Sequence, residues 1–324
     1  MILSLKEEVS ETDTLLGFYN DVIRVFNKEP EAGLDRWICD DLFEDVKKKL
    51  PQYYLPHVEA ALISKNLTQI CDHLSNSDIL IELGSGAHEV FFSKTQKILS
   101  NLPHINKYFP IEICEESLED TIKHAKIFNS SIEVKGLLDD FFKDSWSYLT
   151  SPETVVVCFG NTLGNVPERL NKPAVNLQKK LQQIRNNLPK GAKFLIGYDC
   201  NPNQQDILRT YGNDIFEEYV LNVFHKISSK VATFGFNASD FRCETTWHPQ
   251  SFACIRNAVL LRDVSFLIGK KHFSFKQGDS FPFAYSYKYP VSYFSEVAKK
   301  ANFESVDAFI DDSKRVALQL FEAT

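Results

Sequence analysis

The stretch Ile79–Gly86 has the sequence Ile-Leu-Ile-Glu-Leu-Gly-Ser-Gly. Its short apolar run predicts a buried strand, and the two glycines predict a sharp turn directly after it. Because Gly84 and Gly86 carry no side chain, the backbone at this turn can approach a bound ligand closely. A buried strand that ends in such a turn and leads into a helix is typical of the first unit of a parallel α/β sheet.

Short apolar strands alternate with helices along the chain after this turn. The predicted elements are a helix at 90–99, a strand at 108–113, a helix at 118–127, strands at 132–134 and 155–159, a helix at 173–188 and a strand at 193–198. This alternation predicts a parallel sheet with helices on both faces.

The two ends of the chain follow other patterns. Helices are predicted at 12–26, 42–50 and 58–74, then at 207–226, followed by antiparallel strands over 242–288, a helix at 290–301 and a closing pair of strands at 305–310 and 316–321. We therefore expect residues 61–200 to form the α/β core and residues 201–287 to form an inserted α+β domain. Residues 1–60 should join the inserted domain, and residues 288–324 should return to the core.

Composition narrows the class of protein. The chain has 324 residues and a net charge of −7, which disfavours nucleic acid as an obligate partner. No apolar run approaches the roughly 18 residues that span a bilayer, and the start of the chain is too short for a secretory signal. Seven scattered cysteines indicate reduced thiols, and neither they nor the histidines have metal-ligand spacing. We expect a cytoplasmic protein without a metal or a membrane partner, and a monomer.

The glycine turn and the strand that follows it predict a cofactor site. Glu112 ends the next strand, where such folds present a carboxylate to ribose hydroxyls. The position of a third glycine is taken by Ala87-His88-Glu89, which serves the pyrophosphate of a nicotinamide cofactor poorly. S-adenosylmethionine has no phosphate, and its sulfonium is positive, so it is favoured over a dinucleotide. Asp140 and Phe141 are candidates for the adenine, although Asp140 could instead cap a helix over 141–148.

Three segments carry a resemblance to a known family. They are DLFEDVKKKLPQYY at 41–54, IELGSG at 81–86 and VVVCFGNTLGNVPE at 155–168. Together they resemble the histidine Nα-methyltransferases of ergothioneine biosynthesis, over about residues 37–320. The resemblance implies a class I methyltransferase core with a Rossmann-like sheet, and a substrate domain built from the N-terminal helices and a late insertion. The cofactor residues that follow are Gly84, Ser85, Gly86, Glu112, Asp140, Phe141 and Gly160. Those implied at the substrate's amino and carboxylate groups are Tyr53, Asn165 and Tyr211, with Phe43 nearby.

Asn165 is compatible with this role on physical grounds alone. It follows the strand at 155–159, at the sheet edge where ligands bind, and its amide both donates and accepts hydrogen bonds. An ordinary turn asparagine is the alternative. Tyr53 and Tyr211 offer hydroxyls, although a tyrosine at a helix edge is often there for packing alone.

The chain departs from this family where the imidazole of histidine would be bound. Ala284 stands where the family has an acid, Asn257 where it has a methionine and Cys39 where it has a tyrosine, whereas Ser286 is kept. Losing an acid removes a partner for an imidazole N–H. We therefore expect lower discrimination for histidine and a larger or more aromatic side chain, with Phe283, Tyr285 and Tyr287 as possible walls. Glu217 and Glu218 could instead receive a basic side chain, or simply form a solvated helix face.

The sequence thus predicts a methyltransferase that uses S-adenosylmethionine to methylate the α-amino group of an amino acid or a related small amine, tryptophan-like or otherwise different from histidine. Asn165, Tyr53 and Tyr211 are its candidate catalytic residues, and Asn257, Ala284 and Ser286 line its expected substrate pocket. A non-catalytic cofactor-binding protein is the main alternative. A nicotinamide-dependent oxidoreductase and a methyltransferase of protein or nucleic acid are less favoured.

Overall fold

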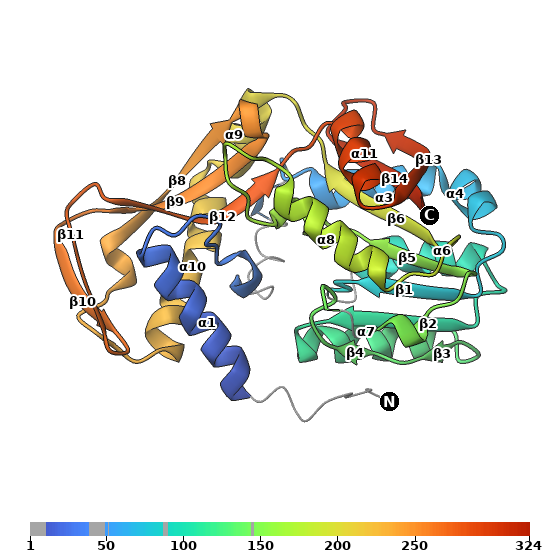
Figure 1. Cartoon of the computed structure of the whole chain (residues 1–324), viewed down its shortest axis with the longest axis horizontal. Coiled ribbons are helices and arrows are strands. Elements are labelled where there is room, and N and C mark those ends of the chain that lie inside the picture. Colours follow the sequence, from blue (N-terminus) through green and yellow to red (C-terminus); the bar gives the residue numbers. More distant parts are fainter. Residues whose placement is uncertain (1–10, 39–48, 51, 87–89, 144–145) are drawn as a thin grey trace.

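The stretch Ile79–Leu83 forms β1, an interior strand of the main sheet, and all five of its residues are buried. The computed structural model describes residues 11–38, 49–50, 52–86, 90–143 and 146–324. Figure 1 shows two lobes: the main sheet with its helices on the right, and the lobe that contains most of the antiparallel strands on the left.

The main sheet has eight strands. They are β1, β2 (Lys107–Glu112), β3 (Glu133–Val134), β4 (Leu137–Leu138), β5 (Thr154–Cys158), β6 (Lys193–Asp199), β13 (Phe303–Ile310) and β14 (Val316–Ala323). Their order is β13-β14-β6-β5-β1-β2-β3, with β4 also paired to β2. All neighbours pair in parallel except β14, which is antiparallel to both β6 and β13. The predicted Rossmann-like sheet and its closing hairpin are confirmed.

The chain order reverses at β1, which has β2 on one side and β5 on the other. Ligands of such sheets bind outside the carboxyl ends of the strands at this reversal. The sheet topology therefore points to the loops that follow β1, β2 and β5.

Helices cover both faces of this sheet. One face carries α3 (Leu55–Lys65), α4 (Leu67–His73), α6 (Gln96–Asn101) and α7 (Glu115–Phe128), and the other carries α8 (Val175–Asn186) and α11 (Val291–Lys300). The single helix expected at 58–74 is two helices, because the chain leaves the helical conformation at Asn66. The expected boundary at residue 60 falls inside α3, which lies against β6 and β14 of the core.

The left lobe combines helices with two small antiparallel sheets. Its helices are α1 (Glu11–Phe26), α9 (Gln204–Tyr211) and α10 (Asp214–Lys230). The strands β12 (Ser280–Tyr287), β9 (Ala253–Leu260) and β8 (Phe241–His248) form one sheet; β11 (Lys271–Phe275), β10 (Val264–Ile268) and β7 (Thr233–Phe234) form the other. The helix expected at 207–226 is divided at residues 212–213, and the side chain of Asn213 caps α10 by accepting a hydrogen bond from the Phe216 N–H.

Many of the 26 phenylalanines form the core of this lobe. Phe26, at the end of α1, has seven other phenylalanine rings around it, with centroid distances of 5.2 to 6.2 Å. Aromatic rings bury large apolar areas, so this cluster fixes α1 against both small sheets.

Membrane-spanning helices and clusters of metal ligands are both absent from the described residues. None of their helices combines the length and the apolarity needed to cross a bilayer. None of their histidine, cysteine, aspartate and glutamate side chains form a group of three or more suited to hold a metal ion.

Candidate active site

The loop after β1 adopts a backbone conformation that requires glycine. Gly84 and Gly86 have φ angles of +71° and +60°, in the left-handed region. A Cβ atom on Gly84 would lie 3.8 Å from the Phe141 ring and 3.7 Å from the Thr162 hydroxyl. The hydroxyl of Ser85, the residue between the two glycines, is buried and has no hydrogen-bond partner among the described residues. The loop thus presents a bare backbone surface and an unsatisfied hydroxyl.

Glu112 fixes this loop from the end of β2. One carboxylate oxygen accepts a hydrogen bond from the Gly86 N–H at 3.1 Å. The other accepts from the N–H groups of Ile113 and Cys114 at 2.8 and 3.2 Å. The carboxylate is partly exposed and keeps lone pairs that a ligand's hydroxyl groups can use.

Asp140 and Phe141 follow β4, and the Phe141 ring lies beside the loop after β1. The Asp140 carboxylate accepts a hydrogen bond from the Phe142 N–H at 3.0 Å, and this bond stabilises a turn. The described part of 141–148 contains only a 3₁₀ turn at Ser147–Leu149, so Asp140 caps no α-helix there. The Phe141 ring is buried next to Gly84. A glycine surface, an apolar ring and a carboxylate are what the ribose and adenine of S-adenosylmethionine need, so these residues fit that cofactor.

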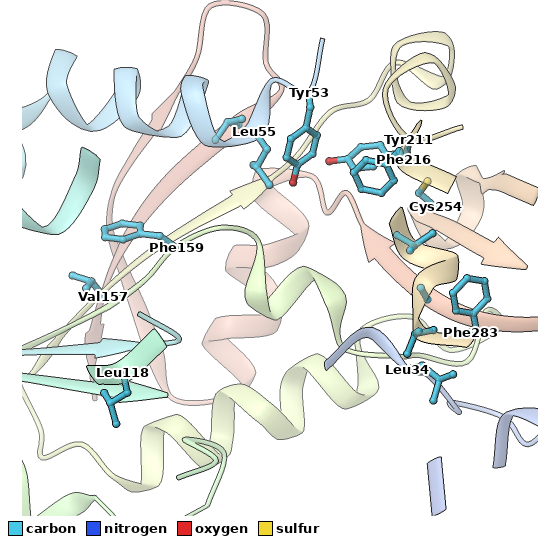
Figure 2. Packing of buried hydrophobic residues seen from close by; sticks show 14 of the residues in the cluster. Leu34, Tyr53, Leu55, Leu118, Val157, Phe159, Tyr211, Phe216, Cys254 and Phe283 are labelled. Atoms are coloured by element: carbon cyan, nitrogen blue, oxygen red, sulfur yellow. The ribbon is translucent and has the colours of Figure 1, made fainter. Parts of the chain in front are cut away.

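A cavity of about 230 Å³ borders the loop after β5. Seven of the predicted residues line it: Tyr53, Gly160, Asn165, Tyr211, Ala284, Tyr285 and Ser286. Figure 2 shows Tyr53 facing Tyr211 and Phe216, and their rings meet at centroid distances of 5.9 and 5.5 Å. Gly160 has a φ of +77°, and no atom of the described residues outside its chain neighbours lies within 4 Å of where its Cβ would be, so it forms an open part of the wall. The residues predicted from distant parts of the chain are therefore brought together.

Phe283 and Tyr287, two of the predicted aromatic walls, do not line this cavity. Phe43, like Cys39, lies outside the described residues. Asn257 does not line the cavity; its amide donates hydrogen bonds to the Thr246 hydroxyl and to the Glu244 carbonyl. Its neighbour Arg256 lines the cavity instead, because successive residues of a strand point to opposite faces of the sheet.

Asn161 organises the loop after β5. Its side-chain oxygen accepts a hydrogen bond from the Asp199 N–H at 3.0 Å. Its amide nitrogen donates to the Asn165 oxygen at 3.3 Å and to the Ser286 hydroxyl at 3.2 Å. One buried side chain thus sets the orientation of Asn165 and connects it to β6 and β12.

Asp199, at the end of β6, fixes the hydroxyl groups of two tyrosines by hydrogen bonds. Its carboxylate accepts hydrogen bonds from the Tyr54 and Tyr211 hydroxyls at 2.7 Å each and from Lys288 at 2.8 Å. Burial and the charge of Asp199 raise the pKa of Tyr211, so its hydroxyl stays protonated. Because this hydroxyl already donates to Asp199, Tyr211 can only accept a hydrogen bond from a ligand. Of the two substrate groups expected near it, an amine therefore suits Tyr211 better than a carboxylate does.

Asp35 supplies an acid near Ala284, although no acid was expected there. It follows Leu34, whose N–H donates to the Phe283 carbonyl at 2.6 Å, and its own carboxylate accepts from the Tyr285 N–H at 2.7 Å. Figure 2 shows Leu34 beside Phe283. Burial raises the pKa of Asp35 to about 7, against the opposing effects of this hydrogen bond and of Arg256. The inference that the pocket lacks an acid is therefore corrected: an acid lines the cavity from a different segment.

The sequence matches the family described as "Histidine-specific methyltransferase, SAM-dependent" over residues 18–323. The chain belongs to this family. A member of the histidine-specific methyltransferase family is an enzyme that uses S-adenosylmethionine, and the glycine loop, Glu112 and Phe141 described above fit that cofactor. The sheet order and the inserted antiparallel strands identify it as a class I methyltransferase with an added α+β part.

Several fungal proteins are similar to this family member. N-methyltransferase fsqC of Aspergillus fumigatus is 26% identical over 268 residues, covering 79% of this chain and 69% of that protein. N-methyltransferase imqF of Aspergillus flavus is 21% identical, covering 96% and 85%. Ergothioneine biosynthesis protein 1 of Neurospora crassa is 24% identical, covering 62% of this chain but only 23% of that longer protein.

Solved structures are similar as well. The CcbJ methyltransferase from Streptomyces caelestis aligns with a TM-score of 0.47 and 16% identity, covering 83% of this chain and 90% of that one. CalS10 from Micromonospora echinaspora, an amino pentose methyltransferase solved with bound S-adenosylmethionine, aligns with a TM-score of 0.37 and 10% identity, covering 83% and 92%.

The residues of the site that were missed in the sequence include Asp35, Asn161, Asp199 and Arg256. Two had a usable signal. Arg256 is the single charged residue in the otherwise largely apolar strand β9, and Asp199 is an acid at the carboxyl end of a core strand, where ligands of such sheets bind. Asp35 had no such signal, because its position in the cavity depends on the tertiary contact between residues 33–35 and β12.

Proposed function

We propose that the protein methylates the α-amino group of a free amino acid or a closely related small amine. The observation that carries this proposal is the meeting of Tyr53, Asn165 and Tyr211 in one cavity whose wall includes Gly160. Thr162, two residues along the same loop, lies beside Gly84 of the cofactor loop. The cavity therefore opens next to the place where the methyl donor fits.

S-adenosylmethionine supplies an electrophilic methyl group, and the protein's residues hold the amine in line with it. Burial raises the pKa of Tyr53 as well as that of Tyr211, so both are neutral phenols. The Tyr211 oxygen and the Asn165 amide can accept hydrogen bonds from an amine and so orient its lone pair. Positioning of this kind lowers the barrier by several kcal/mol, up to about 7–11 in favourable cases. The amine loses its proton to water before the attack, so no strong base is required.

The test is a reaction of the purified protein with S-adenosylmethionine and a panel of free amino acids and biogenic amines, with methylated products identified by mass spectrometry. We expect an N-methylated amino acid from at least one member of the panel. Binding of S-adenosylhomocysteine without any product would favour a non-catalytic role, and would count against the proposal.

Asn165→Ala gives the matching residue-level test. The variant should lose at least 100-fold in turnover, the scale of removing one preorganised hydrogen-bonding group, while it still binds S-adenosylhomocysteine. Asn101→Ala is the matched control, because Asn101 is exposed on α6 and its amide donates only to the Lys97 carbonyl. Equal activity of the two variants would remove Asn165 from the mechanism.

We also propose, from the sequence, that the protein is cytoplasmic and monomeric. Seven cysteines without paired spacing support a reducing, cytoplasmic location. A small-molecule substrate enclosed within one chain supports a monomer, which light scattering on the purified protein can check.

A further inference from the structure

Two charged side chains of the cavity have no partner for one of their polar atoms. The Oδ2 atom of Asp35 and the Nε atom of Arg256 are both shielded from solvent, and neither has a hydrogen-bond partner among the described residues. The two charges do not form a salt bridge with each other, although the charge of each acts on the pKa of the other. Burying a charge without a partner is costly, so both atoms are set to receive a group from outside the chain.

Both side chains belong to residues that line the cavity, and both residues are tied to the same stretch of β12. Arg256 on β9 is paired directly with Ala284 on β12, so their side chains share one face of the sheet. Asp35 is fixed to the next residue of β12 by the Tyr285 N–H. Ser286 is two residues beyond Ala284 on β12. Its hydroxyl accepts a hydrogen bond from the Asn161 amide, which also donates to Asn165. The amine end and the Asp35–Arg256 end are therefore separate parts of one cavity.

The walls between the two ends are aromatic. Arg256 lies over the rings of Tyr211 and Phe216, at 5.0 and 5.2 Å from their centroids, and Tyr219 and Tyr285 also line the space. The small side chain of Ala284 leaves room opposite Arg256. Aromatic walls favour a flat ring, and rings pair well in edge and offset contacts.

The charges of this end define the polar group that fits. An ionised Asp35 accepts a hydrogen bond, whereas the Nε–H of Arg256 donates one. Together they are neutral, so a cationic or an anionic side chain would place a like charge against one of them. A neutral group that donates one hydrogen bond and accepts another satisfies both.

We propose that Asp35 and Arg256 select an amino-acid substrate whose side-chain ring donates one hydrogen bond and accepts another, as a phenol or a neutral imidazole does. This inference rests on the proposed function and specifies its substrate class. It changes the expectation drawn from Ala284: the acid that β12 lacks is supplied by Asp35. An indole, which only donates, satisfies one of the two atoms, and a phenyl ring satisfies neither.

The first test compares substrates that differ by one group. The wild-type enzyme should have a kcat/KM at least 100-fold higher for tyrosine or histidine than for phenylalanine, because a site built for hydrogen bonds rejects an analogue that lacks them. Tyrosine and histidine are tested separately, and at least one of them must show this preference over both phenylalanine and tryptophan. A preference for phenylalanine or leucine would overturn the inference.

The second test changes each side chain. Asp35→Asn keeps an oxygen for the Tyr285 N–H but turns a hydrogen-bond donor toward the substrate. The ratio of kcat/KM for the wild type's preferred substrate to kcat/KM for phenylalanine should therefore fall at least 10-fold in this variant. Asp263→Asn is the matched control, since Asp263 is an exposed acid that accepts bonds from Lys276 and Gln277. Arg256→Met should also lower the ratio of kcat/KM for the preferred substrate to kcat/KM for phenylalanine. Arg242→Met is the matched control, since Arg242 is at an exposed position of β8, and it should leave this ratio unchanged.

Binding of S-adenosylhomocysteine to every variant shows that it is folded. If the wild type methylates no amino acid while it binds this product, the proposed function fails. If the wild type is active but Asp35→Asn and Arg256→Met keep the wild-type ratio of kcat/KM between the preferred substrate and phenylalanine, the proposed function stands and the selection by Asp35 and Arg256 fails.

Discussion

At the scale of single residues, Asn161 connects more of the site than any predicted catalytic residue does. It has a φ of +63°, which asparagine tolerates better than most side chains, and it makes hydrogen bonds to Asp199, Asn165 and Ser286. Asn161→Ala removes all three bonds, at a cost of about 1 kcal/mol each in stability. It also leaves the Asn165 amide free to rotate, so turnover should fall while S-adenosylhomocysteine still binds.

Asn302→Ala is the control for this variant. Asn302 has a φ of +62°, so alanine there meets the same backbone strain, but the residue is exposed and remote from the cavity. Steady-state kinetics and denaturant unfolding of both variants separate strain from catalysis. A turnover loss shared equally by both variants would show that Asn161 acts through the backbone alone.

Asp35 carries a pH prediction at the same scale. Burial raises its pKa to about 7, so its carboxylate becomes ionised as the pH rises through this value. Hydrogen bonds to an ionised acceptor are about twice as strong as neutral ones. The ratio of kcat/KM for tyrosine to that for phenylalanine should therefore rise between pH 6 and pH 8, and the titration of the amino groups cancels in this ratio. Asp35→Asn should show a ratio independent of pH; a wild-type ratio that falls over this range would contradict the assignment.

At the scale of elements, a buried ion pair joins three segments behind the cavity. Glu59 of α3 pairs with Lys94 in the π-helical turn Phe91–Thr95 and accepts the Gly160 N–H, at 3.0 and 3.1 Å from its two oxygens. Both side chains are almost fully buried. Lys94→Met leaves Glu59 without its counter-charge and should cost about 3–5 kcal/mol in the free energy of unfolding.

The double variant tests whether that cost comes from the unpaired charge. Glu59→Gln combined with Lys94→Met removes both charges, and the glutamine oxygen can still accept the Gly160 N–H. Its free energy of unfolding, measured by urea titration, should lie closer to that of the wild type than to that of Lys94→Met alone. Additive losses from the two single substitutions would show that the pair is not coupled.

Elements of the core could be predicted because their signals are local. The apolar run at 79–83 and the glycines after it determine a strand and a turn within eight residues, and β5, β6, α7 and α8 lie within a few residues of their predicted ranges. The breaks at Asn66 and at 212–213 could not be predicted, because the helical periodicity continues across both. In β9 the prediction chose Asn257 and missed Arg256, since a shift of one residue moves a side chain to the other face.

At the scale of the whole molecule, the cavity draws residues from three distant parts of the chain. Asp35 and Tyr53 come from the N-terminal segment, Gly160 and Asn165 from the core, and Arg256 from the inserted strands. Periodicity describes each of these parts separately. Periodicity says nothing about the distance between Asp35 and Arg256, so the Asp35–Arg256 end of the cavity could be identified only from the three-dimensional structure.

Cofactor binding should stabilise the molecule as a unit, because the site joins the loops after β1, β2 and β5. A ligand at 100 times its Kd adds about 2.7 kcal/mol, which for 324 residues corresponds to a rise of about 4 °C in Tm. Gly84→Ala should remove most of this rise when S-adenosylhomocysteine is added. Its Cβ would be in ordinary contact with Phe141 and Thr162, so the ligand-free protein would bear only the strain of a positive φ, about 1–2 kcal/mol.

Gly278→Ala separates these two effects. Gly278 has a φ of +86° with open space around its missing Cβ, and it lies in the turn between β11 and β12. Both variants should melt at similar temperatures without ligand, below the wild type, because both meet the same kind of strain. On adding S-adenosylhomocysteine, only Gly278→Ala should recover the rise of the wild type. If Gly84→Ala recovers it fully as well, the cofactor does not contact the backbone at Gly84, and the glycine is required for the turn alone.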